Sequence, residues 1–178
     1  LEGTASKADT IAYRTKRTIE ERMQEDPAFY KRFSEMLEEA IRAFRAQRLS
    51  DADYLRRVSE ISTSIRSRAT DNLPAKLRHH DVAKAFYGIA LEILAPHAEG
   101  NCDAREVAAV AGLGIDEIIA RNRIVNWVNN ADVQNQMRTA IEDYLFELKD
   151  EHSLDLTFED IDSIMEQCLD IARVRYPE

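Results

Sequence analysis

The sequence predicts an all-α protein, an irregular helical bundle of about seven helices. Apolar residues recur at helical spacing along nearly the whole chain, and no stretch of useful length alternates apolar and polar residues as a strand does. The chain has only 5 Gly and 4 Pro in 178 residues, which is few for a loop-rich or all-β fold. Apolar residues make up 44% of the chain, enough for a packed core.

The length predicts one domain, which we place at residues 8–178, preceded by a disordered or artificial lead at residues 1–7. The first residues, Leu1-Glu2-Gly3, suggest a piece of a longer protein. No apolar run reaches the ~18 residues of a membrane span, and no signal segment opens the chain.

Three helices are predicted in the first part of the chain. The first covers residues 8–25, with Ile11, Thr15, Ile19 and Met23 on one face. The second starts with Asp26 as N-cap and Pro27 at the first helical position, where its missing N–H costs nothing. Its apolar stripe is Phe29, Phe33, Met36, Leu37, Ala40, Ile41 and Phe44. The third starts at Ser50, and its stripe is Tyr54, Leu55, Val58, Ile61 and Ile65.

The remaining helices follow a segment in which Asn72 and Pro74 predict a short helical turn and no domain boundary. Residues 81–95 form the next helix, with a buried stripe of Val82, Phe86, Ile89, Ala90, Ile93 and Leu94. A helix capped by Asp103 or Asn101 runs to Ala111, where "GLG" breaks it, and residues 115–128 resume it. The last two helices cover residues 131–150 and 158–175. The second of them begins with a capping box of Thr157 and Asp160. Its buried stripe is Ile161, Ile164, Met165, Cys168, Ile171 and Ala172.

The stretch "WVNNADVQNQMRTAIEDYLFEL" is the start of the 131–150 helix, with Asn130 as its N-cap. Trp127 is expected at the joint between two helices, in preference to a base-stacking role. The buried stripe is Val133, Met137, Ala140, Ile141, Tyr144, Leu145 and Leu148, and the outward side chains are Gln134, Asn135, Arg138, Glu142 and Asp143. Phe146 falls at the edge of the stripe and is a candidate for partner contact.

No motif predicts catalysis, a cofactor or a metal. None of the 5 glycines precedes Lys, as a phosphate-binding loop requires. His79 and His80 are adjacent, so on a helix they point about 100° apart and rarely chelate one ion. The paired carboxylates fall on polar faces. We expect Cys102 and Cys168 to be reduced thiols.

Charge is unevenly distributed. The formal net charge is −9, of which residues 1–80 carry +3, from 16 Lys and Arg against 13 Asp and Glu. Residues 81–178 carry −12, from 8 against 20. This pattern is typical of a protein with one side for a polyanion and an acidic side for another partner, and it equally fits two solvated surfaces.

Basic residues gather on the second and third helices and just beyond them. On a shared ridge of two antiparallel helices, guanidinium groups contact phosphates without recognising bases. The alternative is pairing within each helix, as in Glu38–Arg42 and Asp53–Arg57. The candidate contact residues are Arg42, Arg45, Arg48, Arg56, Arg57, Arg66, Arg68 and Arg78.

Several segments together resemble a known family. They are "EDPAFYKRFSEML", "DYLRRVSEI", "DVAKAFYGI", "VQNQMRTAIEDYLFEL" and "LTFEDIDSIMEQCLDIARVRYPE", in this order. The set resembles the C-terminal helical domain of the R (motor/endonuclease) subunit of type I restriction enzymes, over roughly residues 8–177. These segments are structural signatures and not catalytic motifs.

The resemblance implies a parent subunit that is a cytoplasmic, ATP-dependent translocase and type I site-specific deoxyribonuclease. ATP and magnesium would belong to domains outside this sequence. The helical domain would dock the motor onto the methyltransferase core, made of modification and specificity subunits, and contact duplex DNA as a weaker second role. The alternative is a structural scaffold that braces the other domains of the R subunit in cis. An exposed apolar patch would favour docking, and a uniformly polar surface would favour the scaffold.

Overall fold

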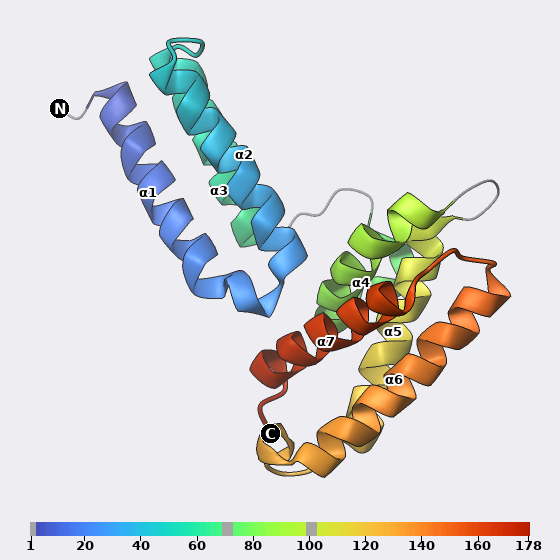
Figure 1. Ribbon diagram of the computed structural model, residues 1–178. Helices are drawn as coiled ribbons and strands as arrows, with labels where there is room; N and C mark the ends of the chain where they lie inside the picture. The colour runs from blue at the N-terminus through green and yellow to red at the C-terminus, as the bar shows by residue number, and fades with distance from the viewer. Residues whose placement is uncertain (1–2, 69–72, 99–102) are drawn as a thin grey trace. The chain divides into compact units, whose positions relative to one another are not determined.

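The computed structural model describes residues 3–68, 73–98 and 103–178, and the only regular secondary structure in these ranges is helical (Figure 1). The α-helices are α1 (Thr4–Arg22), α2 (Pro27–Arg45), α3 (Asp51–Ser67), α4 (Asp81–Leu94), α5 (Ala104–Asn122), α6 (Ala131–Glu151) and α7 (Phe158–Arg175). Short 3-10 segments lie at Met23–Glu25, Ala75–Leu77, Ala95–His97 and Trp127–Asn129. The predicted all-α class is confirmed.

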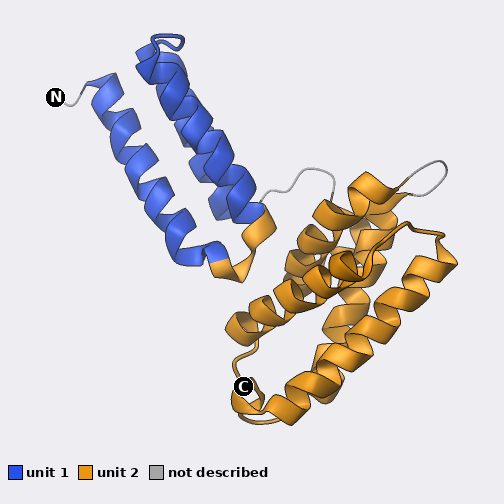
Figure 2. Ribbon diagram, viewed as in Figure 1, with its two compact units in different colours: residues 1–23, 29–72 blue, residues 24–28, 73–178 orange. Residues whose placement is uncertain are grey.

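The chain divides into two compact units (Figure 2). Unit 1 comprises residues 1–23 and 29–72, and unit 2 comprises residues 24–28 and 73–178. Unit 1 has 14 Lys and Arg against 11 Asp and Glu, a net charge of +3, and unit 2 has 10 against 22, a net charge of −12. The charge asymmetry of the sequence therefore follows the division into units. The organisation of residues 8–178 as one domain stays a prediction.

Unit 1 is a three-helix unit with an aromatic core. Tyr54 of α3 links the other two helices, because its ring stacks on Phe44 of α2 with centroids 4.2 Å apart and its hydroxyl donates to Asp9 of α1 at 3.0 Å. Burial, followed by the bond to Asp9, raises the pKa of Tyr54 to about 12. Around this contact the buried apolar side chains are Ala8, Ala12, Ile19, Phe29, Tyr30, Phe33, Leu37, Ala40, Val58, Ile61 and Ile65.

The helices of unit 1 differ from prediction in two details. Helix α1 begins at Thr4, before the predicted start at residue 8, and in its first turn the Lys7 N–H donates to the Gly3 carbonyl at 3.0 Å. On α2, Met36 is 46% exposed, whereas Tyr30, outside the predicted stripe, is buried. Met36 lies at the margin of the stripe, where periodicity does not decide burial.

Unit 2 packs four helices, with α4 against α5 and α7, and α6 against α5 and α7. The predicted stripe of α7 is buried at every position, including Cys168, and burial raises the pKa of the Cys168 thiol. On α6, Ala140 and Tyr144 are half-buried and the other stripe positions are buried. The capping box of Thr157 and Asp160 is confirmed, as is Asn130 as the N-cap of α6.

The predicted break at Gly112-Leu113-Gly114 is wrong, because α5 continues through it to Asn122. A Cβ on Gly112 would lie 2.8 Å from the Ala83 carbonyl oxygen and 2.9 Å from the Tyr87 backbone nitrogen, both on α4. A Cβ on Gly114 would lie 2.2 Å from the Tyr144 ring of α6. These two glycines allow α4 and the Tyr144 side chain of α6 to pack closely against α5, and they do not end the helix.

Trp127 lies at a joint between helices, as predicted. Its side chain is fully buried, and its indole N–H donates to the Tyr176 carbonyl oxygen at 2.7 Å. Gln134, predicted to face outward, instead donates to the carbonyl oxygens of Trp127 and Val128 at 3.3 and 2.8 Å. Because α5 ends at Asn122, Trp127 belongs to a separate 3-10 turn and not to the predicted 115–128 helix.

Candidate functional site

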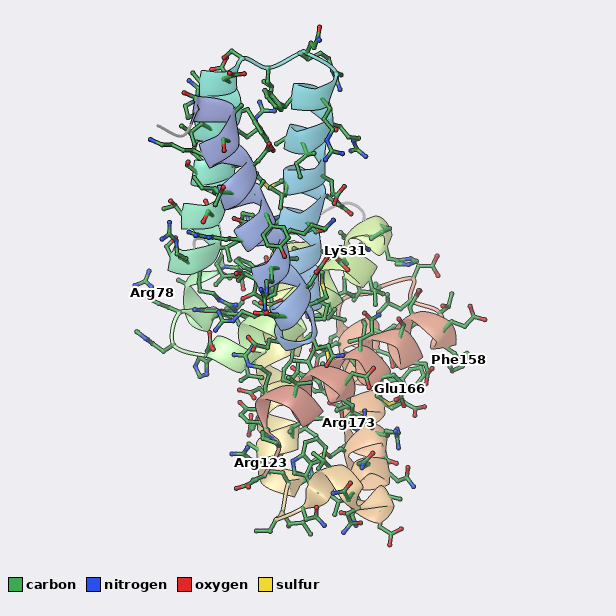
Figure 3. The ribbon with its side chains drawn as sticks, turned by 90° about the vertical axis from the view of Figure 1, so that its left-hand side faces the viewer. Lys31, Arg78, Arg123, Phe158, Glu166 and Arg173 are labelled. Carbon is green, nitrogen blue, oxygen red and sulfur yellow. The ribbon has the colours of Figure 1, made fainter. Side chains whose placement is uncertain are left out.

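The candidate arginines of unit 1 fall into two groups and not one ridge. Arg42, Arg45 and Arg48 lie at or just beyond the end of α2, and Arg56 and Arg57 lie in the first two turns of α3, which follows it in the chain. Arg66 and Arg68 lie about ten residues further along α3, which corresponds to roughly 15 Å of helix. Arg78 is exposed, and it belongs to unit 2 (Figure 3).

Part of the first group is engaged in ion pairs. Arg42 pairs with Glu39 at 3.0 Å, and Arg56 pairs with Asp53 at 2.9 Å. Both pairs are exposed and have i, i+3 spacing, not the predicted i, i+4 spacing. Arg45, Arg48 and Arg57 are exposed, and none of them has an ion pair within the described ranges.

Arg68 has a structural role. Its guanidinium carbon lies 4.8 Å from the centre of the Phe29 ring, and it donates to the Tyr30 hydroxyl at 3.1 Å. Its backbone adopts φ 53°, in the left-handed conformation that ends α3. We therefore assign Arg68 to the packing of α3 on α2.

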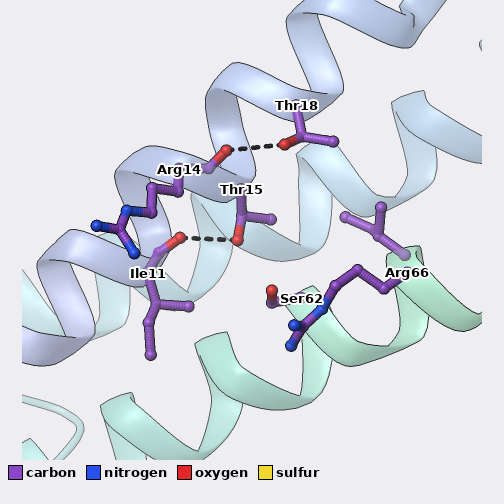
Figure 4. Close-up of a pocket in the computed structure, with 7 residues that line it drawn as sticks. Ile11, Arg14, Thr15, Thr18, Ser62 and Arg66 are labelled. Carbon is purple, nitrogen blue, oxygen red and sulfur yellow. Dashed lines mark hydrogen bonds between the residues drawn. The ribbon is translucent and has the colours of Figure 1, made fainter.

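A groove of about 280 Å³ lies between α1 and α3, within unit 1 (Figure 4). Arg14 from α1 and Arg66 from α3 line it, and neither has an ion pair within residues 3–68, 73–98 and 103–178. No carboxylate is among the described residues that line it, which are Ile11, Arg14, Thr15, Thr18, Ser62, Ile65 and Arg66. The groove is therefore cationic at its sides and apolar at Ile11 and Ile65.

A second groove, of about 330 Å³, lies between α6 and α7 in unit 2. Phe158 stands at the first position of α7 and is 78% exposed, and Figure 3 shows its side chain projecting from the surface. Its ring meets Phe146 of α6 edge-on, with centroids 5.6 Å apart. Ile161 and Met165 are buried beneath the groove.

The second groove is rimmed by carboxylates. Glu142, Glu159 and Asp162 line it, all are exposed, and none has an ion pair within the part of the chain that the structure describes. The neighbouring Asp160 carboxylate is engaged in other contacts, because it accepts a hydrogen bond from the Thr157 N–H and pairs with His97 at 3.2 Å. These contacts, the Thr157 backbone bond first, lower the pKa of Asp160.

Over residues 3–68, 73–98 and 103–178, no three His, Cys, Asp or Glu side chains are placed to hold one metal ion. Cys168 is buried without a disulfide, and Cys102 lies outside the described residues. No helix in these ranges combines the length and apolar character that a membrane crossing requires.

Arg14 and Phe158 line these grooves but were not among the candidate contact residues predicted from sequence. Phe158 lies three positions before Ile161, so periodicity places it beside the core stripe, and only the packing of α6 and α7 leaves it exposed. Arg14 lies on α1, where no sequence pattern distinguishes it from its basic neighbours. Phe146, named from sequence as a candidate for partner contact, lines the second groove, and its contact with a partner stays a prediction.

The comparison with protein families matches residues 7–173 to the family described as "Type I restriction enzyme HindI endonuclease subunit-like, C-terminal". No curated protein and no solved structure matches the chain. The match runs from the first turn of α1 to the last turn of α7, so the described residues that line the two grooves lie within it.

Proposed function

The chain belongs to the family of C-terminal domains of type I restriction enzyme HindI endonuclease subunit-like proteins, and from this premise we propose that it is a non-catalytic docking module. It attaches the ATP-dependent translocase and endonuclease to the methyltransferase core of modification and specificity subunits. ATP and magnesium ions act in other domains of the parent subunit.

The aromatic pair of unit 2, the exposed Phe158 against the half-buried Phe146, carries this proposal. A Phe that is 78% exposed at the start of a capped helix leaves apolar surface in water, which burial against a partner removes at a gain of about 1.5–3 kcal/mol. The capping box fixes the first turn of α7, so the backbone position of Phe158 is set before the partner arrives. Aromatic side chains bury large apolar areas and dominate the energetics of protein interfaces.

Contact with duplex DNA is the second function that we propose, and the positive charge of unit 1 supports it. Unit 1 has a net charge of +3, whereas unit 2 has −12. Phosphate contact therefore belongs to unit 1. Because the whole chain is at −9, this contact is weaker than protein docking.

A scaffold that braces the motor domains in cis is the rival function. It requires no partner from another polypeptide, so the two functions differ in what the isolated 178-residue chain binds.

A pull-down distinguishes them. The tagged 178-residue chain is mixed with the purified complex of modification and specificity subunits, with and without duplex DNA. We expect retention of the complex by the wild type and its loss with Phe158→Asp, because a carboxylate in the groove leaves an unpaired charge in the interface. Val125→Asp is the matched control, since Val125 is 88% exposed and outside the groove.

Retention of the methyltransferase complex by neither the wild type nor the control variant would favour the scaffold. Equal retention by Phe158→Asp and wild type would place docking elsewhere on the chain. Circular dichroism of each variant establishes that it is folded.

A further inference from the structure

We infer that the groove between α1 and α3 is a phosphate-binding site that takes a phosphodiester of nucleic acid between Arg14 and Arg66. This inference rests on the DNA contact proposed above and moves it from the arginines around the α2–α3 turn to this groove. Arg14 is a new candidate, and Arg66 is the one member of the earlier set that lines the groove.

The two guanidinium groups come from different helices of one unit. Arg14 on α1 and Arg66 on α3 line the same groove, and both are exposed (Figure 4). Helices α1 and α3 pack directly on each other, so the packing of unit 1 fixes the backbone positions of both residues. Two cations facing one groove without a carboxylate repel each other, and an anion between them removes that repulsion.

One hydroxyl group, that of Ser62, adds to the two guanidinium groups. Thr15 and Thr18 donate their hydroxyl protons to the carbonyl oxygens of Ile11 and Arg14, at 2.7 and 3.1 Å. The Ser62 hydroxyl has no such bond within the described ranges, so it remains a donor toward the groove. The donors are thus two guanidinium groups and one hydroxyl, which suit phosphate oxygens.

The arginines near the α2–α3 turn are less suited to this role. Arg42 and Arg56 already pair with Glu39 and Asp53. Asp51 and Asp53 lie in the first turn of α3, among these arginines. A phosphate there meets carboxylates as well as guanidinium groups, whereas the described residues of the groove include none.

Fluorescence anisotropy with a labelled duplex tests the site. The 178-residue chain is titrated at several salt concentrations as wild type, Arg14→Glu/Arg66→Glu and Arg45→Glu/Arg57→Glu. The two double variants change the net charge equally, within one unit and at exposed positions. We expect the groove variant to lose about tenfold or more in affinity and to lower the salt slope by about 2, since each lost phosphate contact lowers it by about 1. We expect only a small loss for the turn variant.

The possible outcomes distinguish the groove site from the proposed DNA contact. Equal losses of affinity in both variants, or a larger loss in the turn variant, would contradict phosphate binding in the groove but not DNA contact by unit 1. A wild-type DNA affinity that does not change with salt concentration, or no DNA binding, would contradict both the groove site and the proposed DNA contact. Arg14→Gln/Arg66→Gln repeats the test without introduced carboxylates, and its melting temperature establishes that it is folded.

A competition arm separates nucleic acid from small phosphates. Pyrophosphate is added at constant ionic strength, with chloride as the balancing salt. For a phosphodiester site, displacement of the duplex requires millimolar pyrophosphate. Tight binding of pyrophosphate, with no DNA binding that depends on Arg14 and Arg66, would overturn the assignment to nucleic acid.

Discussion

Tyr54 is buried in unit 1 and Tyr176 is half-buried in unit 2. Tyr54 donates to Asp9 at 3.0 Å and Tyr176 donates to Asp116 at 2.7 Å. Burial first, and then the bonded carboxylate, raises the pKa of each tyrosine to about 12. Both tyrosines therefore keep their protons in the folded state at a pH at which the unfolded chain loses them.

This difference predicts alkaline destabilisation. Because the folded pKa lies above the unfolded value of 10.0, the stability that each tyrosine contributes is complete below pH 10 and is lost as pH rises toward 12. Tyr54→Phe should be less stable than wild type by about 1 kcal/mol at pH 8. We expect that gap in urea unfolding to shrink between pH 10 and 11.5. A gap that stays constant over this range would contradict the raised pKa.

Single residues also mark where prediction from sequence was strong and where it failed. Trp127 was placed correctly at a helix joint, because a large aromatic beside a capped helix has few other environments. The exposure of Phe158 was not predictable from its position, since burial depends on the neighbouring helix. The predicted ion pairs Glu38–Arg42 and Asp53–Arg57 are replaced by Glu39–Arg42 and Asp53–Arg56, because i, i+3 and i, i+4 spacings differ little in energy.

At the scale of elements, local chemistry predicted the helix starts well. Ser50 accepts from the Asp53 N–H at 3.0 Å, and Asn130 and Thr157 cap α6 and α7 as predicted. The predicted break within α5 was wrong. Glycine occurs both at helix ends and inside helices where a neighbouring helix approaches closely. Only the presence of α4 against Gly112 decides between them, and single-sequence periodicity does not contain that contact.

The close approach of α4 and α5 predicts the effect of Gly112→Ala. Alanine favours a helix over glycine by about 1 kcal/mol, so an open site would gain stability. At Gly112 the added methyl meets backbone atoms of Ala83 and Tyr87, which cannot move without shifting α4. We expect a net loss of about 1–3 kcal/mol in the free energy of unfolding.

Ala120→Gly, on the exposed face of α5, supplies the reference cost of about 1 kcal/mol for the reverse exchange in this helix. Thermal or urea unfolding measures both variants. A Gly112→Ala variant more stable than wild type would show that α4 and α5 do not approach as described.

At the scale of the whole molecule, charge and apolar exposure divide the two proposed roles between the two units. Unit 1 is basic overall and carries the groove of Arg14 and Arg66, whereas unit 2 is acidic and carries the groove of Phe146 and Phe158. The sequence predicted the charge asymmetry, since it is a count along the chain. It did not predict the grooves, because each requires two helices distant in sequence to meet.

Hydrogen exchange of the 178-residue chain, with and without the purified modification and specificity complex, tests the docking role most directly. We predict slower amide exchange in residues 152–162, around Phe158, and unchanged exchange in α5. Phe158→Asp should abolish this protection. Association that leaves residues 152–162 unprotected, or no association at all, would contradict docking through the Phe146–Phe158 groove.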